Sequence, residues 1–153
     1  MVTGTIGKAE IATLIPHAGL MCLLDSVLRW DSTSIVCLAS GHRDADNPLA
    51  HGGELAAICG IEYAAQAMAI HGGLTAGRRP EAGYLASVRD VICHTGRLDL
   101  LRDDIEVTAA VVAADSAGAI YRFVLRHGQE TILEGRAAVV LDAGRHSGIV
   151  PPA

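Results

Sequence analysis

The sequence predicts an α+β fold in which one antiparallel sheet wraps around a single long helix. Residues 54–71 are rich in Ala, Ile and Leu and read as a helix buried on most sides, whereas the other long apolar runs have the β-rich character of strands. Neither an internal repeat nor a linker divides the chain, so residues 1–144 are expected to form one domain. Residues 145–153, with Pro151 and Pro152, are expected to be a loose tail.

The elements before the central helix follow from short local patterns. Residues 8–14 read as a short helix that ends before Pro16, because the residue before a proline is pushed out of the helical region. Residues 21–30 read as a strand in which Val and Leu alternate with polar residues, and residues 33–40 read as a second strand. Asp31 lies between these two strands, so we expect them to form a hairpin.

The central helix is expected to end at Gly72-Gly73, where a residue in the left-handed conformation commonly caps a helix. Several of its residues recur at spacings of three and four and are expected to share one face. These residues are Leu55, Ile58, Cys59, Glu62, Ala65, Gln66 and Ala69. Beyond a turn at residues 77–80, four β-rich runs follow, with a hairpin turn at residues 127–129. The runs are residues 83–94, 105–114, 120–126 and 131–141.

The composition excludes several classes of partner. A formal net charge of −5 does not indicate the basic surface that binds nucleic acid or an anionic membrane. The longest apolar segment is interrupted by Glu62 and Gln66, and the N-terminus lacks the basic and apolar regions of an export signal. We therefore expect no membrane span and a cytoplasmic location. The four cysteines lie in apolar surroundings without a C-x-x-C pair, which favours reduced, packed thiols over a zinc site.

Glu62 stands in the middle of the apolar helix, and His51 lies on the glycine-rich turn just before it. Burying a carboxyl group costs free energy unless it is neutralised, paired or hydrogen-bonded, and neutralisation raises its pKa into the range of a general acid. The two residues therefore suggest proton-transfer chemistry near the start of the helix. The alternative is that Glu62 lies at a dimer seam and pairs with Arg89 or another cation, and that His51 is an exposed loop residue.

The remaining histidines and basic residues indicate no separate site. His42, His51 and His71 match no metal-ligand spacing. We expect His71 to cap the C-terminus of the helix, where a cation is favoured. Arg78 and Arg79, just after the helix, are either solvated charges or a contact for an acidic carrier protein. Three further histidines are expected at the surface or in turns: His94, His127 and His146.

Five segments resemble, in the same order, the hot-dog-fold 3-hydroxyacyl-(acyl carrier protein) dehydratases. They are Ile15-Pro16-His17, Leu23-Leu24-Asp25-Ser26-Val27, Asn47-Pro48-Leu49-Ala50-His51-Gly52, Ile61-Glu62-Tyr63-Ala64-Ala65-Gln66 and Gly83-Tyr84-Leu85-Ala86-Ser87-Val88. The similarity covers nearly the whole chain. It is greatest to the ApeP-like branch, associated with aryl polyene and related polyene biosynthesis, in which a G-I-E-Y-A-A-Q-A-M-A helix is typical.

The resemblance implies a hot-dog fold assembled as a dimer, with active sites at the subunit interface. Carried over residue by residue, the family's acid falls on Glu62 and its base on His51, which takes the C2 proton while Glu62 protonates the departing hydroxyl. His42 and His17 remain alternatives to His51, because the spacing from His51 to Glu62 is shorter than in the fatty-acid-synthesis enzymes. Backbone N–H groups near Ala57 and Ile58, at the helix start, are expected to bind the thioester oxygen.

The expected reaction is dehydration of a 3-hydroxyacyl chain tethered through phosphopantetheine to an acyl carrier protein, giving a trans-2-enoyl thioester. It requires neither a metal nor a bound cofactor. One alternative is a hot-dog thioesterase, which would release a free acid instead. Another is a non-catalytic partner that supplies one wall of a heterodimeric active site to a second hot-dog subunit, so the expected assembly is a homodimer or a heterodimer.

Overall fold

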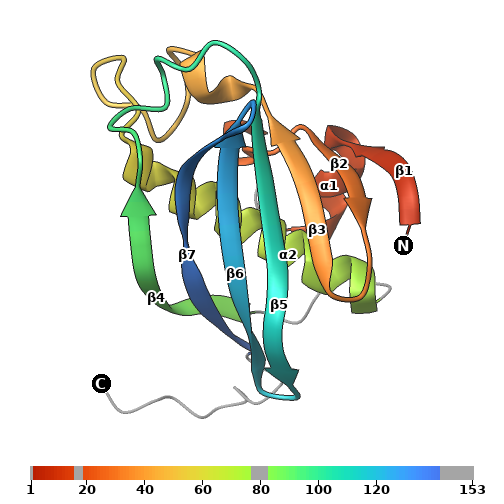
Figure 1. Cartoon of the computed structure of the whole chain (residues 1–153). Helices are drawn as coiled ribbons and strands as arrows, with labels where there is room; N and C mark the ends of the chain where they lie inside the picture. The colour runs from red at the N-terminus through yellow and green to blue at the C-terminus, as the bar shows by residue number, and fades with distance from the viewer. Residues whose placement is uncertain (1, 16–18, 77–82, 142–153) are drawn as a thin grey trace, which may run out of the picture.

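The computed structural model describes residues 2–15, 19–76 and 83–141 of the 153-residue chain (Figure 1). Within these ranges a sheet of seven antiparallel strands has the order β1-β2-β3-β5-β6-β7-β4. The strands are β1 (Val2–Gly7), β2 (Ser26–Trp30), β3 (Ser34–Ala39), β4 (Gly83–Cys93), β5 (Ile105–Asp115), β6 (Gly118–His127) and β7 (Glu130–Leu141). The helices are α1 (Lys8–Leu14) and α2 (Gly60–Ala76), with 3₁₀ turns at Gly19–Met21, Gly41–Arg43 and Ala57–Cys59.

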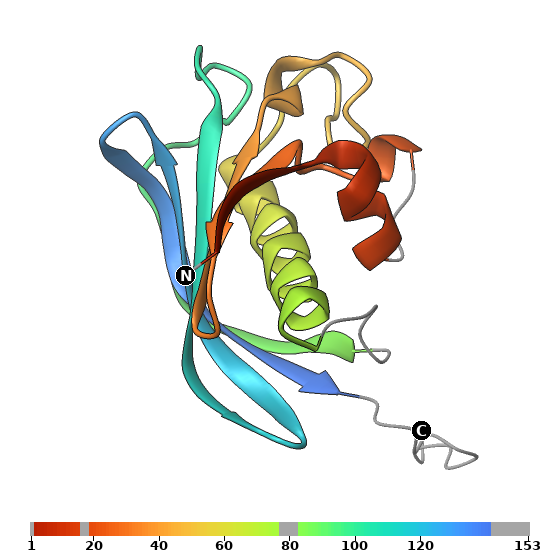
Figure 2. The ribbon, with the colours of Figure 1, turned by 90° about the vertical axis from the view of Figure 1, so that its right-hand side faces the viewer.

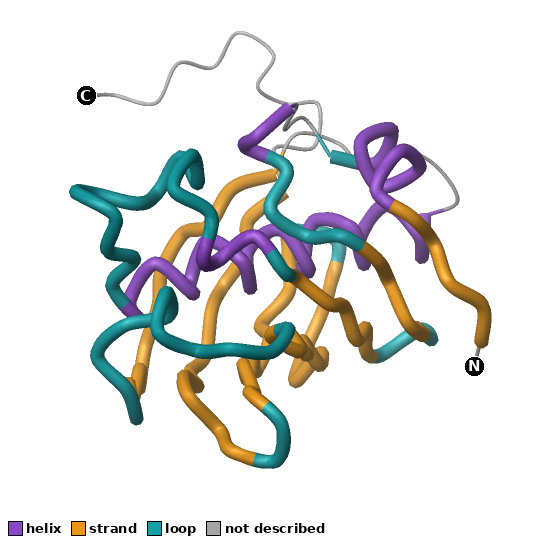
Figure 3. Tube along the Cα trace, turned by 90° about the horizontal axis from the view of Figure 1, so that it is seen from above, coloured by secondary structure: helices purple, strands orange, loops and turns teal. Residues whose placement is uncertain are grey.

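The sheet curves around α2, which lies in its hollow (Figure 2). Seen from above, α2 runs across the strands (Figure 3). The core forms between the two, where Tyr63 and Ile70 of α2 meet Phe123 and Leu125 of β6, all of them fully buried. α1 lies on the side of α2 that faces away from the sheet (Figure 2). None of the described helices is long and apolar enough to cross a membrane.

The α+β fold with one sheet around a central helix is confirmed. The structure has α1 at residues 8–14, as the sequence predicts, and the β2–β3 hairpin turns at Asp31, whose Oδ1 accepts hydrogen bonds from the N–H groups of Thr33 and Ser34. The β6–β7 hairpin turns at Gly128, where φ is +62°. Glycine takes this left-handed conformation without steric cost.

Three expectations about the elements are wrong. α2 begins at Gly60 rather than residue 54, and it continues through Gly72-Gly73 to Ala76 because neither glycine has the positive φ of a helix cap. Residues 21–25 are not part of the strand, since β2 begins at Ser26. β1, which pairs with β2 at the sheet edge, has no counterpart among the expected elements.

The expected helix face and the expected thiol packing are only partly correct. Gln66 on that face is fully buried, but Ile58 is 51% exposed and Glu62 is half-buried, while Tyr63 and Ala67 point into the core. Cys22 and Cys37 are buried free thiols, and burial raises the pKa of Cys37 to about 12. Cys93 is exposed, against expectation.

Several predictions fall outside the described residues. They concern Pro16, His17, the turn at 77–80 with Arg78 and Arg79, His146, and the expected tail at 145–153.

Candidate active site

Glu62 lies in the first turn of α2, and the start of this helix is held close to the sheet. A Cβ atom at Gly60 would come within 2.6 Å of a side-chain carbon of Leu133 on β7 and 2.8 Å of one of Leu125 on β6. Only glycine fits such an approach without moving its neighbours. The sheet therefore fixes the position of the helix turn that carries the half-buried Glu62 carboxyl.

Gln66, one turn beyond Glu62, ties α2 to the segment that precedes β2. Its side chain is fully buried, its Oε1 accepts a hydrogen bond of 2.9 Å from the Leu23 N–H, and its Nε2 donates one of 2.7 Å to the Met21 carbonyl. This backbone belongs to no strand, so the amide supplies hydrogen bonds that a strand neighbour would otherwise provide. Residues 21–23 are thereby held over the same side of α2 as Glu62.

Asn47 ties a second loop to α2, at the residue next to Glu62. Its Nδ2 donates hydrogen bonds of 3.0 Å to the Gly41 carbonyl and to the Tyr63 hydroxyl, and its Oδ1 accepts one of 2.9 Å from the Leu49 N–H. Asn47 is buried, and burial raises the pKa of Tyr63, so the phenol stays neutral. The Asn47-Pro48-Leu49 motif is therefore an anchor between the loop and the helix.

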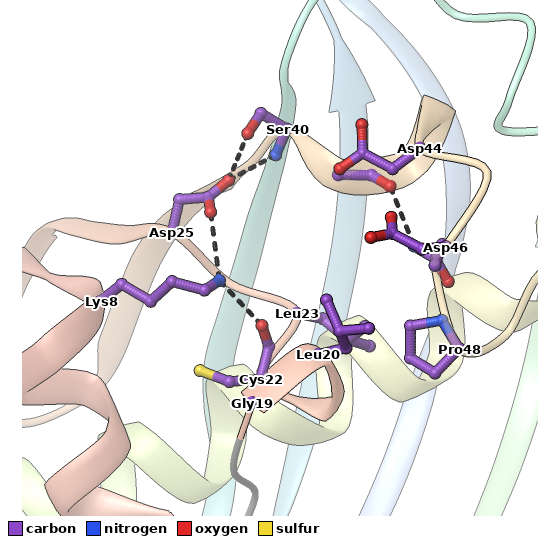
Figure 4. Close-up of a pocket in the computed structure, with 12 residues that line it drawn as sticks. Lys8, Gly19, Leu20, Cys22, Leu23, Asp25, Ser40, Asp44, Asp46 and Pro48 are labelled. Atoms are coloured by element: carbon purple, nitrogen blue, oxygen red, sulfur yellow. Dashed lines mark hydrogen bonds and ion pairs between the residues drawn. The ribbon is translucent and has the colours of Figure 1, made fainter.

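A pocket of about 160 Å³ lies between the two segments that Gln66 and Asn47 hold (Figure 4). Its apolar wall is formed by Leu20, Cys22, Leu23 and Pro48, and its polar side by Lys8, Asp25, Ser40, Asp44, Asp46 and Asn47. The Lys8 ammonium donates to the Cys22 carbonyl at 2.8 Å and to Asp25 Oδ1 at 3.1 Å. Although burial raises the pKa of Asp25, hydrogen bonds from Ser40 and the charge of Lys8 hold it below its usual range. Asp25 therefore stays ionised as part of the pocket wall.

His51 lies on an exposed two-residue turn. Its N–H donates to the Glu54 carbonyl at 2.8 Å, and the Glu54 N–H donates back at 3.1 Å. Between them Gly52 and Gly53 have φ values of +60° and +81°, as a type I′ turn requires. Within one chain His51 lies on the surface ahead of the helix, and the expected contact with Glu62 would be made between two subunits.

Residues 54–57 are paired with residues 96–99, which positions the helix start. The Leu55 N–H donates to Asp99 Oδ1 at 2.9 Å, and the hydrogen bonds from Arg97 hold the pKa of Asp99 at about 2. The Ala57 N–H donates to the Gly96 carbonyl at 3.0 Å. The assumption that the first turn leaves the Ala57 donor unpaired is therefore wrong. Ile58, the second expected donor, is the more exposed of the two residues.

His42, an alternative to His51, is buried against the loop before β5. Its Nε2 donates a hydrogen bond of 2.8 Å to the Leu101 carbonyl, and its buried Nδ1 has no partner among the residues that the structure describes. Burial lowers the pKa of His42, so the ring is held neutral. The third alternative, His17, lies outside the described residues.

His71 is not at the end of the helix, so the expected capping role is wrong. It is buried in the middle of α2, where Nε2 donates at 2.8 Å to the Asp31 carbonyl and Nδ1 accepts from the Tyr121 hydroxyl at 2.7 Å. Burial lowers the pKa of His71 and raises that of Tyr121 to about 12. The described residues contain no group of three or more His, Cys, Asp or Glu side chains placed to hold a metal ion.

Sequence reasoning assigned no role to Asn47 or Gln66. Both stand in sequence motifs, and each is a polar side chain in or beside an apolar helix that has to be hydrogen-bonded if it is buried. That requirement is the signal that could have identified them.

A curved antiparallel sheet around one long helix, with an acid in the first turn of that helix, defines a hot-dog protein with a candidate acid–base site. A sequence model described as ApeP-like, ApeP dehydratase, matches residues 9–145. The chain belongs to this ApeP-like family and is a dehydratase with the hot-dog fold. No curated protein matches the sequence closely enough to count as a relative.

Solved structures share the fold at low sequence identity. The dehydratase heterocomplex ApeI:P from Xenorhabdus doucetiae is 19% identical with a TM-score of 0.76, and the match covers 86% of this chain and 90% of that chain. A thioesterase from Haemophilus influenzae is 10% identical with a TM-score of 0.58, covering 80% and 82%. The PaaI protein from the phenylacetic acid degradation operon of E. coli is 12% identical with a TM-score of 0.56, covering 77% and 78%.

Proposed function

We propose that this dehydratase acts on 3-hydroxyacyl chains bound through phosphopantetheine to an acyl carrier protein, and gives trans-2-enoyl thioesters in fatty acid or polyene biosynthesis in the cytoplasm. The observation that carries the proposal is the placement of Glu62. It lies on a helix turn that the sheet fixes from one side and that Gln66 and Asn47 connect to two loops on the other. A proton donor in such a site keeps its geometry during the reaction.

In the proposed mechanism His51 removes the proton from C2 and Glu62 protonates the departing hydroxyl as water. Negative charge develops on the thioester oxygen, which needs hydrogen-bond donors. We assign this role to the 3₁₀ turn that precedes α2, where the expected donors are the N–H groups of Ala57 and Ile58. Since the Ala57 N–H donates to Gly96, the Ile58 N–H is the main donor. No metal or bound cofactor takes part.

We infer that the active site is completed by a second hot-dog subunit, whose Glu62 or equivalent acid faces His51. Two features support this inference. β4 is an edge strand of eleven residues, and exposed edges commonly pair with another strand. Ile58 at the helix start and Ile92 on β4 are half-exposed, at 51% and 50%, so a partner would cover apolar surface. The partner is a second copy or a different hot-dog chain, as in the ApeI:P heterocomplex.

The second candidate function is that of a non-catalytic partner subunit. The similarity to a dehydratase heterocomplex, together with the exposed position of His51, supports it. A hot-dog thioesterase is the remaining alternative, and it differs in its product.

The test incubates the purified chain with a 3-hydroxyoctanoyl chain on a bacterial acyl carrier protein and identifies the product by mass spectrometry. We expect loss of one water with the thioester intact. Release of free 3-hydroxy acid would instead indicate a thioesterase. Dehydration that occurs only after addition of a second hot-dog subunit would indicate a heterodimer, in which His51→Ala and Glu62→Gln then separate a catalytic role from a non-catalytic partner role. Sedimentation of the chain alone distinguishes a homodimer from a monomer.

A further inference from the structure

The outer face of the sheet carries three arginines in one row, although the chain as a whole is acidic. Arg89 on β4 is paired directly with Arg136 on β7, and Arg136 with Arg122 on β6. The neighbouring pairs Val88–Ala137 and Tyr121–Ala137 point into the core, so the three arginines point outward, and all three are exposed. Figure 1 shows these strands side by side, with α2 behind them.

The arginine row is unfavourable for the folded chain by itself. Directly opposed side chains on neighbouring strands have Cβ atoms about 5 Å apart, and like charges at that separation destabilise a sheet. The chain has 17 acidic residues against 12 Lys and Arg, so acids were available to alternate with them. Of the three arginines, Glu134 contacts only Arg122, at 3.4 Å, and Glu134 also hydrogen-bonds His94, at 2.8 Å. Among the described residues no acid pairs with Arg89 or Arg136.

From this arrangement we propose that the arginine row is the docking surface for the acidic face of the acyl carrier protein. The inference rests on the proposed function, which requires such a carrier. Guanidinium groups bind carboxylates through two parallel hydrogen bonds, and a row of them matches a row of carboxylates on an acidic helix. Charge complementarity of this kind raises the association rate and selects the partner.

The position of the row fits delivery of a tethered substrate. β7 carries Arg136 on its outer face and, three residues earlier, Leu133 against the start of α2. β4 is the edge strand, and the chain beyond it pairs Arg97 with Ala56 just before the helix. A carrier on this row would therefore lie on strands that hold the start of α2, on the opposite face of the sheet.

The test compares two substrates with the same 3-hydroxyoctanoyl chain, one on a bacterial acyl carrier protein and one on N-acetylcysteamine. The variant is the double substitution Arg89→Gln, Arg136→Gln. We expect KM for the carrier-linked substrate to rise about tenfold with kcat unchanged, because charges at the edge of an interface act mainly on association. KM for the small thioester should not change, and the difference between variant and wild type should shrink as salt is raised.

Arg126→Gln is the matched control, because Arg126 lies on the same strand and face as Arg122 but opposite Glu106. It should leave both KM values unchanged. Titration of the wild type and the variant with the loaded carrier gives the dissociation constant without turnover, so this result holds even if the chain proves inactive alone. Equal affinity of the two proteins for the carrier would overturn the proposal. So would a wild type that binds anionic lipid vesicles but not the carrier.

Discussion

Glu62 and His51 lie in two regions that differ in how firmly the chain holds them. Around Glu62, Gly60 packs on β6 and β7, and the neighbouring side chains of Gln66 and Tyr63 are buried and hydrogen-bonded. Around His51 the turn is held by backbone hydrogen bonds to Glu54, and its side chains face solvent. The comparison teaches that one chain by itself fixes Glu62, the proposed acid, whereas the orientation of His51, the proposed base, would be set by the second subunit of the proposed assembly.

Removing the acid should have the largest effect on turnover. Glu62→Gln is nearly isosteric, but an amide cannot give up a proton, so we expect dehydration to fall by a factor of about 10⁴ while fold and assembly persist. Turnover and thermal unfolding measured on the same preparation check this prediction. A variant that turns over like the wild type would exclude Glu62 as the acid.

Removing the proposed base should lower turnover by a factor of about 10² to 10⁴, as is usual for a general base. We predict this loss for His51→Ala, with stability nearly unchanged because the side chain is exposed. His42→Ala and His17→Ala should cost far less turnover per folded molecule. If His51→Ala leaves turnover unchanged, and activity depends on adding another hot-dog subunit, this chain is the partner subunit. The acid and the base would then have to be sought on two different chains.

The hydrogen bonds of Gln66 should be worth more to stability than to the chemistry itself. Gln66→Met keeps the volume but leaves the Leu23 N–H and the Met21 carbonyl without the amide, so the free energy of unfolding should fall by about 2 to 4 kcal/mol. Denaturant unfolding measures it. Glu62→Gln on the same side of α2 is the control and should show the reverse pattern, with activity lost and stability kept. Equal stability of Gln66→Met and wild type would show that the amide does not hold residues 21–23.

The elements that the sequence predicts well are those set by local pattern. Helix α1, the β2–β3 hairpin and the turn at Gly128 depend on residues only a few positions apart. The placement of Glu62 on the apolar helix was also predicted, and its role as the acid stays a prediction. What could not be predicted depends on distant contacts. Gly72-Gly73 stays helical within a buried helix, and the partner of His71 lies 50 residues away, at Tyr121.

The two buried histidines, His42 and His71, should make the stability of the folded chain depend on pH. Burial lowers the pKa of both below the value of 6.5 that they have when unfolded. Above that pH both states are neutral and the folded state keeps its full stability. As the pH falls below it, the unfolded chain binds protons that the folded chain does not, so the free energy of unfolding decreases. The slope reaches at most about 1.4 kcal/mol per pH unit for each histidine.

Denaturant unfolding between about pH 5 and 6.5 measures the contribution of the histidines to the loss of stability. The carboxylates with lowered pKa, such as Asp25 and Asp99, contribute to that loss only in more acidic solution. His42→Gln should reduce the slope by about half, since the amide can still donate to the Leu101 carbonyl but does not titrate. The remaining half belongs to His71, which joins α2 to Asp31 and to β6. A slope that His42→Gln leaves unchanged would mean that the folded chain protonates His42 as readily as the unfolded chain does. In that case the loop before β5, which binds His42, would open in acid without a loss of stability. The part of the chain that is held firmly would then be limited to α2 and to the segments that Gln66 and Asn47 bind.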